Sequence, residues 1–184
     1  MINPIIILEG PDSAGKTTLA EYLATKYGFP YLHGAHLGEA SKETYIKYHK
    51  DQLKSAILNR DCHDICVVLD RHWPSYVVYN EWEEEIPLAV EASGLYATNF
   101  PELDDVPVVY IFCLPDREQV ELKYKEDPDH VWSAEERFEH YQRYETIYLA
   151  KVGKFPETCF RFDYMKHGTS QTAMDFFIEA VLND

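Results

Sequence analysis

The sequence predicts a single three-layer α/β domain, in which a five-stranded parallel sheet is covered by helices on both faces. Short runs of consecutive apolar residues alternate along the chain with longer segments whose apolar residues recur at helical spacing. Strands without polar alternation are typical of parallel sheets, because both faces of such a sheet are buried. The length also suits one core, and no repeat or linker divides residues 1–184 into smaller domains.

Five segments have the composition of buried strands. Each is a short, mostly apolar run, and the first and third end directly before a glycine and an aspartate. Because helical segments lie between the runs, the strands are expected to be parallel. The predicted strands are Pro4–Glu9, Phe29–Leu32, Ile65–Leu69, Val106–Leu114 and Cys159–Phe162.

The first helices are recognised by apolar spacing and by residues that favour helix ends. A helix over Lys16–Tyr27 is expected to end at Gly28, since glycine readily adopts the left-handed conformation found there. Ser41–Asn59 is predicted to be the second helix. Asp116 follows the fourth strand and is expected to cap the start of a third helix.

Two further helices complete the predicted domain. Ser133 and Glu136 have the spacing of a capping box, which opens a helix that runs to about Lys151. The last segment of the chain is predicted to form a helix that buries one apolar stripe against the sheet. The residues of that stripe are Ala173, Phe176, Phe177, Ala180 and Val181.

The chain carries 17 Lys and Arg against 32 Asp and Glu, which gives a net charge of −15. Extended duplex-DNA and anionic-membrane surfaces need clustered basic residues, so such surfaces are not expected. No segment has the ~20 apolar residues that span a bilayer, and the N-terminus lacks the basic segment of a signal peptide. We therefore expect a cytoplasmic protein whose four cysteines are free thiols.

A phosphate-binding loop follows the first predicted strand. Residues 10–17, Gly-Pro-Asp-Ser-Ala-Gly-Lys-Thr, match the pattern G-x-x-x-x-G-K-[ST]. Backbone N–H groups of such a loop surround the phosphates, with Lys16 at the β- and γ-phosphates and the Thr17 hydroxyl on Mg²⁺. The fold is therefore predicted to be that of P-loop NTPases. The expected ATP-binding residues are Gly10, Ser13, Ala14, Gly15, Lys16, Thr17 and Thr18.

P-loops occur in switches, motors, transporters and kinases, so the loop alone does not define a reaction. The guanine-specifying motif N-K-x-D of GTPases is missing from the sequence. The D-x-x-G switch motif does not follow the strand that ends at Asp70, and an ABC-type signature is also missing. These features favour a small kinase over a GTPase switch or a transporter ATPase.

The segment Glu9–Thr18 resembles the E-G-x-D-x-x-G-K-[ST]-T loop of thymidylate kinases, including an acidic residue inside the loop. Residues 70–79, which begin Asp-Arg-His, resemble this family's second signature, D-R-[YH]-x-x-S-x-x-[AV]-[YF]. Less specific matches follow, and the similarity covers most of the chain outside residues 31–63. The resemblance implies a P-loop kinase fold with a short helical lid.

The resemblance also implies roles for three more residues. Asp70 would hold Mg²⁺ directly or through water, and Arg71 would clamp the acceptor phosphate with its bidentate guanidinium. Asp12 would contact the acceptor sugar or orient the acceptor beside the loop. From the residues alone, Asp70 and Arg71 could also form a surface ion pair, and Asp12 could serve only to cap the loop.

A lid cation is expected between Lys123 and Arg143, because phosphoryl transfer depends on positioning and on neutralising charge. Arg137 is the first candidate, since the sequence around it, ERFE, resembles the E-R-[YF]-E helix that follows the lid in thymidylate kinases. Lys123, Lys125 and Arg143 are the alternatives, and each could instead be an ordinary solvated residue. The lid is predicted at about residues 123–137.

The segment after the first helix departs from the thymidylate kinase pattern. That family has an arginine near its second strand that reads the base and the acceptor phosphate, whereas residues 31–36 contain none. His33 and His36 could supply polar contacts or stack on a base, or they could be ordinary loop histidines. The aromatic rings of residues 73–79 could wall a base pocket or belong to the core. The acceptor base is therefore not determined.

The predicted function is transfer of the γ-phosphoryl group of ATP to a small nucleotide, with a (deoxy)nucleoside monophosphate as acceptor and Mg²⁺ as cofactor. Two alternatives stay open. One is a kinase for a hydroxyl of a deoxynucleoside, or of a modified base or end in a polynucleotide, although the net charge of −15 disfavours a polymer. The other is a non-kinase NTP-binding switch. The resemblance also implies a homodimer.

Overall fold

The computed structural model describes residues 3–34, 40–90, 106–126, 130–168 and 170–183. Its sheet has five parallel strands in the order β2-β3-β1-β4-β5, which confirms the predicted sheet. Relative to the prediction, β2 begins at Tyr31 rather than Phe29, and β3 extends through Asp70. The strands are β1 (Ile5–Glu9), β2 (Tyr31–His33), β3 (Val67–Asp70), β4 (Val108–Cys113) and β5 (Cys159–Phe162).

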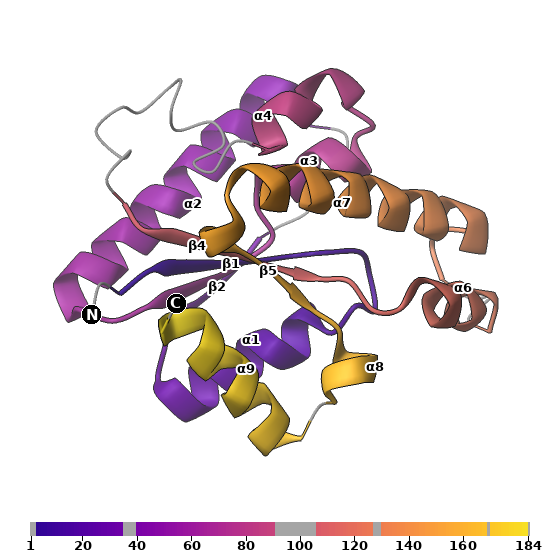
Figure 1. The fold of residues 1–184 in the computed structure, drawn as a ribbon. Helices are drawn as coiled ribbons and strands as arrows, with labels where there is room; N and C mark the ends of the chain where they lie inside the picture. The colour runs from indigo at the N-terminus through magenta and orange to yellow at the C-terminus, as the bar shows by residue number, and fades with distance from the viewer. Residues whose placement is uncertain (1–2, 35–39, 91–105, 127–129, 169, 184) are drawn as a thin grey trace.

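The helices form two layers, one on each face of the sheet (Figure 1). Helices α1 and α9 cover one face, whereas α2, α3, α4 and α7 cover the other, as the predicted three-layer fold requires. Within the described ranges, each helix is too short or too polar to span a bilayer. The helices are α1 (Lys16–Tyr27), α2 (Lys42–His63), α3 (Trp73–Tyr79), α4 (Ile86–Val90), α6 (Arg117–Lys125), α7 (Ala134–Lys154), α8 (Tyr164–His167) and α9 (Gln171–Asn183).

Strand β1 contributes to both halves of the core, because successive side chains of a strand point to opposite faces of the sheet. Ile5 and Ile7 pack into the cluster on the side of α2, α3 and α7. Ile6 and Leu8 pack into the cluster on the side of α1 and α9. All four side chains are fully buried. The strand therefore needs an unbroken apolar run rather than alternating polar and apolar residues.

Side-chain caps fix several helix starts as predicted. Ser133 accepts a hydrogen bond from the backbone N–H of Glu136, whose carboxylate accepts one from the backbone N–H of Ser133, so the predicted capping box is present. Asp116 caps α6 by accepting bonds from two backbone N–H groups of its first turn. Helix α2 continues past its predicted end at Asn59 and stops where Asp64 adopts a left-handed φ of 50°.

The apolar stripe predicted for the last helix is only partly correct, because Val181 is buried and Phe177 packs against the core, whereas two other members of the stripe are exposed. The buried residues of α9 include Met174, Ile178 and Val181, which are spaced at i, i+4 and i+7. Phe176, which was predicted to be buried, is 78% exposed, and Ala180 also faces solvent. The helix is apolar on more than one face, and only one face can contact the sheet.

This difference gives a stability test. Ile178→Ala is expected to lower the free energy of unfolding by about 2–5 kcal/mol, because it removes buried methylene groups and leaves a cavity. Phe176→Ala is expected to change the free energy of unfolding by less than about 0.5 kcal/mol, since its ring lies at the surface. Urea unfolding of the two variants, followed by circular dichroism, measures both values. Equal losses would contradict the observed orientation of α9.

Candidate active site

The loop between β1 and α1 has two glycines with positive φ angles. Gly10 has a φ of 137°, and a Cβ atom at this position would lie 2.3 Å from the carbonyl oxygen of Cys113 on β4. Gly15 has a φ of 86° and directly precedes α1. The helix therefore begins inside the loop, and the unpaired N–H groups of its first turn are available to an anionic ligand.

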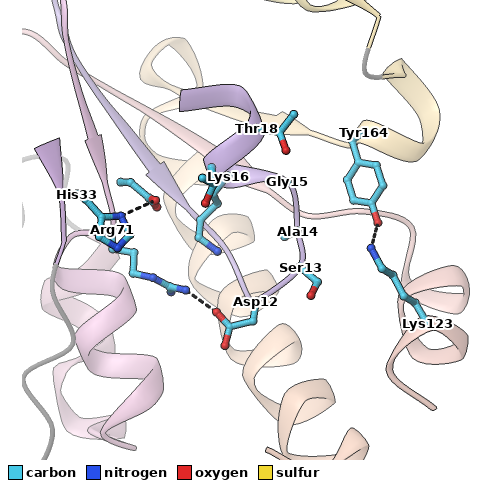
Figure 2. A pocket seen from close by; sticks show the side chains of 12 residues that line it. Asp12, Ser13, Ala14, Gly15, Lys16, Thr18, His33, Arg71, Lys123 and Tyr164 are labelled. Carbon is cyan, nitrogen blue, oxygen red and sulfur yellow. Dashed lines mark hydrogen bonds and ion pairs between the residues drawn. The ribbon is translucent and has the colours of Figure 1, made fainter. Parts of the chain in front are cut away.

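A cavity of about 410 Å³ opens beside this loop (Figure 2). The phosphate loop forms one side of the cavity, and side chains from β2, β3, α6 and α8 complete it. The predicted ATP-binding residues from Ser13 to Thr18 all line it, whereas Gly10 supports the turn behind them. The lining residues are Asp12, Ser13, Ala14, Gly15, Lys16, Thr17, Thr18, His33, Asp70, Arg71, Lys123 and Tyr164.

Lys16 lies at the wall of this cavity and is 5% exposed. Its Nζ donates hydrogen bonds to the carbonyl oxygens of Gly10, at 2.7 Å, and Pro11, at 2.6 Å. Burial lowers the pKa of Lys16 to about 8, and the nearby positive charge of Arg71 acts in the same direction. Anionic phosphate oxygens are stronger acceptors than neutral carbonyls, so the position of this ammonium favours a phosphorylated ligand.

Asp70 ends β3, the strand that pairs with β1 in the sheet. Its Oδ2 accepts a hydrogen bond of 2.9 Å from the Tyr31 hydroxyl and lies 3.1 Å from Nδ1 of His33. Its Oδ1 is buried and has no hydrogen-bond partner among the described residues. A buried carboxylate oxygen without a donor is costly unless a cation or a water molecule binds it.

Thr17 and Asp70 fit a magnesium ion that is bound jointly with phosphates. Mg²⁺ usually takes one or two protein ligands and completes its shell with water and phosphate oxygens. Both residues line the cavity beside the loop, and Asp70 Oδ1 still needs a partner. In the part of the chain that the structure describes, no group of three or more His, Cys or acidic side chains is arranged to hold a metal.

A second cavity of about 450 Å³ adjoins the first. The two cavities share Asp12, His33 and Arg71, so their junction lies at these side chains. The wall of the second cavity is mainly apolar and includes the rings of Tyr76, Tyr79 and Trp132. It also includes His130, whose Nε2 lies 4.0 Å from Asp12 Oδ2. Its lining residues are Asp12, His33, Gly34, Arg71, Ser75, Tyr76, Tyr79, Asn80, His130, Val131 and Trp132.

Arg71 forms the cationic part of this junction. Its Nη2 donates a hydrogen bond of 2.5 Å to Asp12 Oδ1, and its guanidinium lies 4.9 Å from the centre of the Tyr79 ring (Figure 2 shows the Asp12 contact). Burial raises the pKa of Asp12, but the positive charges of Arg71 and Lys16 outweigh that effect and hold it below its usual value. Arg71 and Asp12 are therefore an ion pair between two cavities rather than an isolated surface pair.

The aromatic residues near Arg71 divide between the cavity and the core. Tyr76 and Tyr79 line the second cavity. Trp73 is fully buried, and its ring packs against those of Tyr76 and Trp82, so it belongs to the core. His33 lies at the junction of the cavities, whereas His36 is outside the described residues.

No protein-family model and no curated sequence matches this chain, but solved structures do. The YorR protein from Bacillus subtilis, in complex with phosphorylated GDP, matches with a TM-score of 0.64 at 17% identity, over 97% of this chain and 96% of its own. Deoxyadenosine kinase from M. mycoides with bound dCTP has a TM-score of 0.57 at 15% identity, over 97% and 99%. Thymidylate kinase from Ehrlichia chaffeensis has a TM-score of 0.57 at 16% identity, over 97% and 98%. This chain shares the three-layer α/β P-loop fold of these proteins.

In this P-loop fold, the candidate site lies where parallel strands end. The phosphate loop follows β1, Asp70 ends β3, and His33 ends β2. Crevices at the carboxyl ends of strands are the usual ligand sites of open parallel sheets. The sheet order, with β1 between β3 and β4, therefore brings the loop and the Asp70–Arg71 segment together.

Within the same fold, Arg137 does not occupy the position predicted for a lid cation. It is 3% exposed, its Nη2 donates a hydrogen bond of 2.6 Å to the Tyr124 carbonyl oxygen, and it stacks on the Tyr124 ring at 4.7 Å. It lines neither cavity, so its placement favours a structural contact between α6 and α7. Lys125 also lies outside both cavities, where it forms an ion pair with Glu121.

Lys123 is the lid candidate that reaches the first cavity. It extends from α6 opposite Arg71, and its Nζ donates a hydrogen bond of 2.9 Å to the Tyr164 hydroxyl (Figure 2). Arg143 instead pairs with Glu81 and Glu83 and lines neither cavity. Of the predicted lid segment, residues 127–129 are outside the described residues, and 130–133 are not helical.

Sequence reasoning assigned no role to Glu9, although it precedes the phosphate loop. Its side chain is fully buried, and burial raises its pKa to about 7 despite hydrogen bonds from Ser75 and the His72 backbone. A signal was present in the sequence, since an acidic residue ends an otherwise apolar strand. The carboxylate's partners lie more than 60 residues away in the chain, so the sequence does not identify them.

Proposed function

We propose that this chain transfers the γ-phosphoryl group of ATP to a ribo- or deoxyribonucleoside monophosphate, with Mg²⁺ as cofactor. One observation carries the proposal: a phosphate-loop cavity and an aromatic cavity meet at the Asp12–Arg71 pair. A kinase needs such an arrangement, because the donor and acceptor must approach each other in line while water is excluded. A simple NTP-binding switch would need only the first cavity.

The donor is expected to bind at the loop. The N–H groups at the start of α1 and the Lys16 ammonium would contact its β- and γ-phosphates. Thr17 and Asp70 would hold Mg²⁺, which neutralises phosphate charge when it is bound. Lys123 would approach the phosphates from α6, because it lines the same cavity as the loop. These groups position the γ-phosphorus at the junction of the two cavities.

The acceptor is expected to occupy the second cavity. The guanidinium of Arg71 would exchange its contact with Asp12 for the acceptor phosphate, and aromatic rings such as Tyr79 would pack against the base. A phosphate oxygen of the acceptor then forms a bond to the γ-phosphorus, while the bond from that phosphorus to the β–γ bridging oxygen breaks and ADP leaves. A phosphate acceptor is already an anion, so this reaction requires no general base.

A transfer assay tests the proposal. The protein is incubated with γ-labelled ATP and Mg²⁺ and with nucleosides, nucleoside monophosphates or short oligonucleotides, and the labelled products are separated. Label on a monophosphate acceptor is expected. Label on a nucleoside or an oligonucleotide would establish the hydroxyl-kinase alternative, for which the deoxyadenosine kinase neighbour is a precedent in fold. Binding or hydrolysis without transfer would contradict kinase activity.

Homodimer formation and cytoplasmic location stay predictions.

The lid assignment predicts a difference between two neighbouring lysines of α6. Lys123→Ala is expected to lower kcat/KM by about tenfold, because it removes a cation from the donor cavity. Lys125→Ala is the matched control, since Lys125 is exposed and pairs with Glu121 outside the cavity; its kcat/KM is expected to stay within about twofold. Initial rates at saturating acceptor and varied ATP measure both. Equal rates for the two variants would exclude Lys123 from the phosphate site.

A further inference from the structure

The turn between β3 and α3 carries Arg71 in an unusual backbone conformation. Arg71 has a φ of 77°, a left-handed conformation that is uncommon for a residue with a side chain. The next residue, His72, is the N-cap of α3 and provides no side-chain capping hydrogen bond. Such a turn persists only when its surroundings hold it in place. The direction of the Arg71 side chain therefore depends on contacts from outside the turn.

Consecutive residues of β1 supply those contacts. The backbone N–H of Arg71 donates a hydrogen bond of 2.9 Å to the carbonyl oxygen of Leu8. Glu9 then binds the start of α3 from the neighbouring strand: its Oε1 accepts from the His72 backbone N–H, and its Oε2 accepts from Ser75 Oγ, each at 2.6 Å. A carboxylate at a helix N-terminus also interacts favourably with the helix dipole. Glu9 thus links β1 to the N-cap residue and to the first turn of this helix.

The same hydrogen bonds continue to the guanidinium. Ser75 Oγ lies 2.8 Å from the Tyr144 hydroxyl, and that hydroxyl lies 3.5 Å from Nη1 of Arg71. Glu9 is therefore connected to Arg71 by two routes. One runs through the backbone of His72, the residue that follows Arg71. The other runs through the side chains of Ser75 and Tyr144. Ser75 and Tyr144 are also buried, so water does not compete readily for these contacts.

We infer that Glu9 is a positioning residue, which fixes the Arg71 guanidinium at the junction of the two cavities without touching either substrate. The inference rests on the proposed function, in which Arg71 binds the acceptor phosphate. Glu9 lines neither cavity. A residue that acts only through Arg71 should affect the acceptor and leave the donor largely unaffected, whereas a general stabilising role would affect both.

Two substitutions of Glu9 distinguish the effect of its side-chain length from the effect of its negative charge. Glu9→Asp keeps the charge but withdraws the carboxylate from the His72 N–H and Ser75; the acceptor KM is expected to rise about tenfold while the ATP KM stays within about twofold. Glu9→Gln keeps the length of the side chain and both contacts. The glutamine oxygen can accept from the His72 N–H, and the Ser75 hydroxyl can rotate to accept a hydrogen bond from the glutamine NH2 group. Its acceptor KM is expected to stay within about threefold of the wild-type value.

Asp175→Asn is the matched control, because this carboxylate accepts hydrogen bonds from Tyr22, Tyr27 and Lys26 away from both cavities. It is expected to lower the unfolding midpoint without changing the acceptor KM.

In an Arg71→Ala background, Glu9→Asp is expected to cause no further rise in acceptor KM, because the two residues act as one unit. A further tenfold rise there, or equal changes in both KM values for Glu9→Asp alone, would overturn the positioning role.

Kinetics of a Tyr144 variant and crystal structures provide two additional tests of the role of Glu9. If Glu9→Asp does not fold, Tyr144→Phe tests the link by removing only the hydroxyl beside Arg71, with an expected rise of about threefold in acceptor KM; an unchanged acceptor KM would then refute it. If the wild-type chain transfers no phosphoryl group, the proposed function fails separately. Crystal structures of the wild type and Glu9→Asp then decide the inference: an Arg71 guanidinium that keeps its contact with Asp12 in both would overturn it.

Discussion

Lys16→Ala is expected to lower kcat/KM for phosphoryl transfer by about 10³-fold or more. The Lys16 ammonium is placed at the wall of the loop cavity by hydrogen bonds to the Gly10 and Pro11 carbonyls. Removing it would take away a positive charge that compensates the negative charge of the transferring group. Single-turnover transfer from labelled ATP measures the loss.

The control for this prediction is Lys54→Ala, since Lys54 is an exposed lysine of α2 outside both cavities. Its kcat/KM is expected to equal that of the wild type within about twofold. The unfolding midpoint of Lys16→Ala must be measured as well, because loss of a buried side chain also affects stability. Folded Lys16→Ala protein with wild-type activity would exclude the loop from the reaction.

Arg71→Ala is expected to raise the acceptor KM by about 10²-fold, while the ATP KM changes only a few-fold. Arg71 is the cation shared by both cavities, and its guanidinium could hold two oxygens of an acceptor phosphate at once. Arg71→Lys is expected to restore only a small part of the affinity, because an ammonium cannot form this paired contact. Steady-state kinetics with the acceptor and ATP varied in turn measure both effects.

Arg117→Ala is a suitable comparison for Arg71, because Arg117 pairs with Glu145 at the exposed start of α6. It should leave both KM values unchanged. An equal rise in the ATP and acceptor KM values of Arg71→Ala would indicate that Arg71 serves the whole site rather than the acceptor. Full activity of Arg71→Lys would show that one point charge is sufficient there.

The sequence predicted the phosphate loop correctly in position because the loop depends on local chemistry. Its glycines, its lysine and the start of α1 follow one another in the chain, and only glycine fits at Gly10 against the Cys113 carbonyl. The capping box of α7 was predictable for the same reason, since Ser133 and Glu136 contact each other within one helical turn. The parallel sheet followed from the unbroken apolar runs.

Packing between distant elements was not predictable in the same way. The last helix is apolar on more than one face, and only its contact with the sheet selects Met174, Ile178 and Val181 over Phe176. Arg137 has the sequence context of a lid cation, yet its guanidinium bonds to the carbonyl of Tyr124 on the preceding helix. In both cases the sequence is compatible with more than one set of contacts, and the packing of distant elements determines which set forms.

The sequence by itself determined that residues 10–17 form a phosphate-loop motif within a parallel α/β sheet, because contiguous residues encode a strand, a turn and a helix start. Only the tertiary structure decided that Arg71 meets Asp12 between two cavities and that Lys123, rather than Arg137, lines the cavity beside the phosphate loop. It also decided that Glu9 holds the Arg71 turn. These contacts join residues from separate strands and helices, so they exist only once the sheet order brings those elements together.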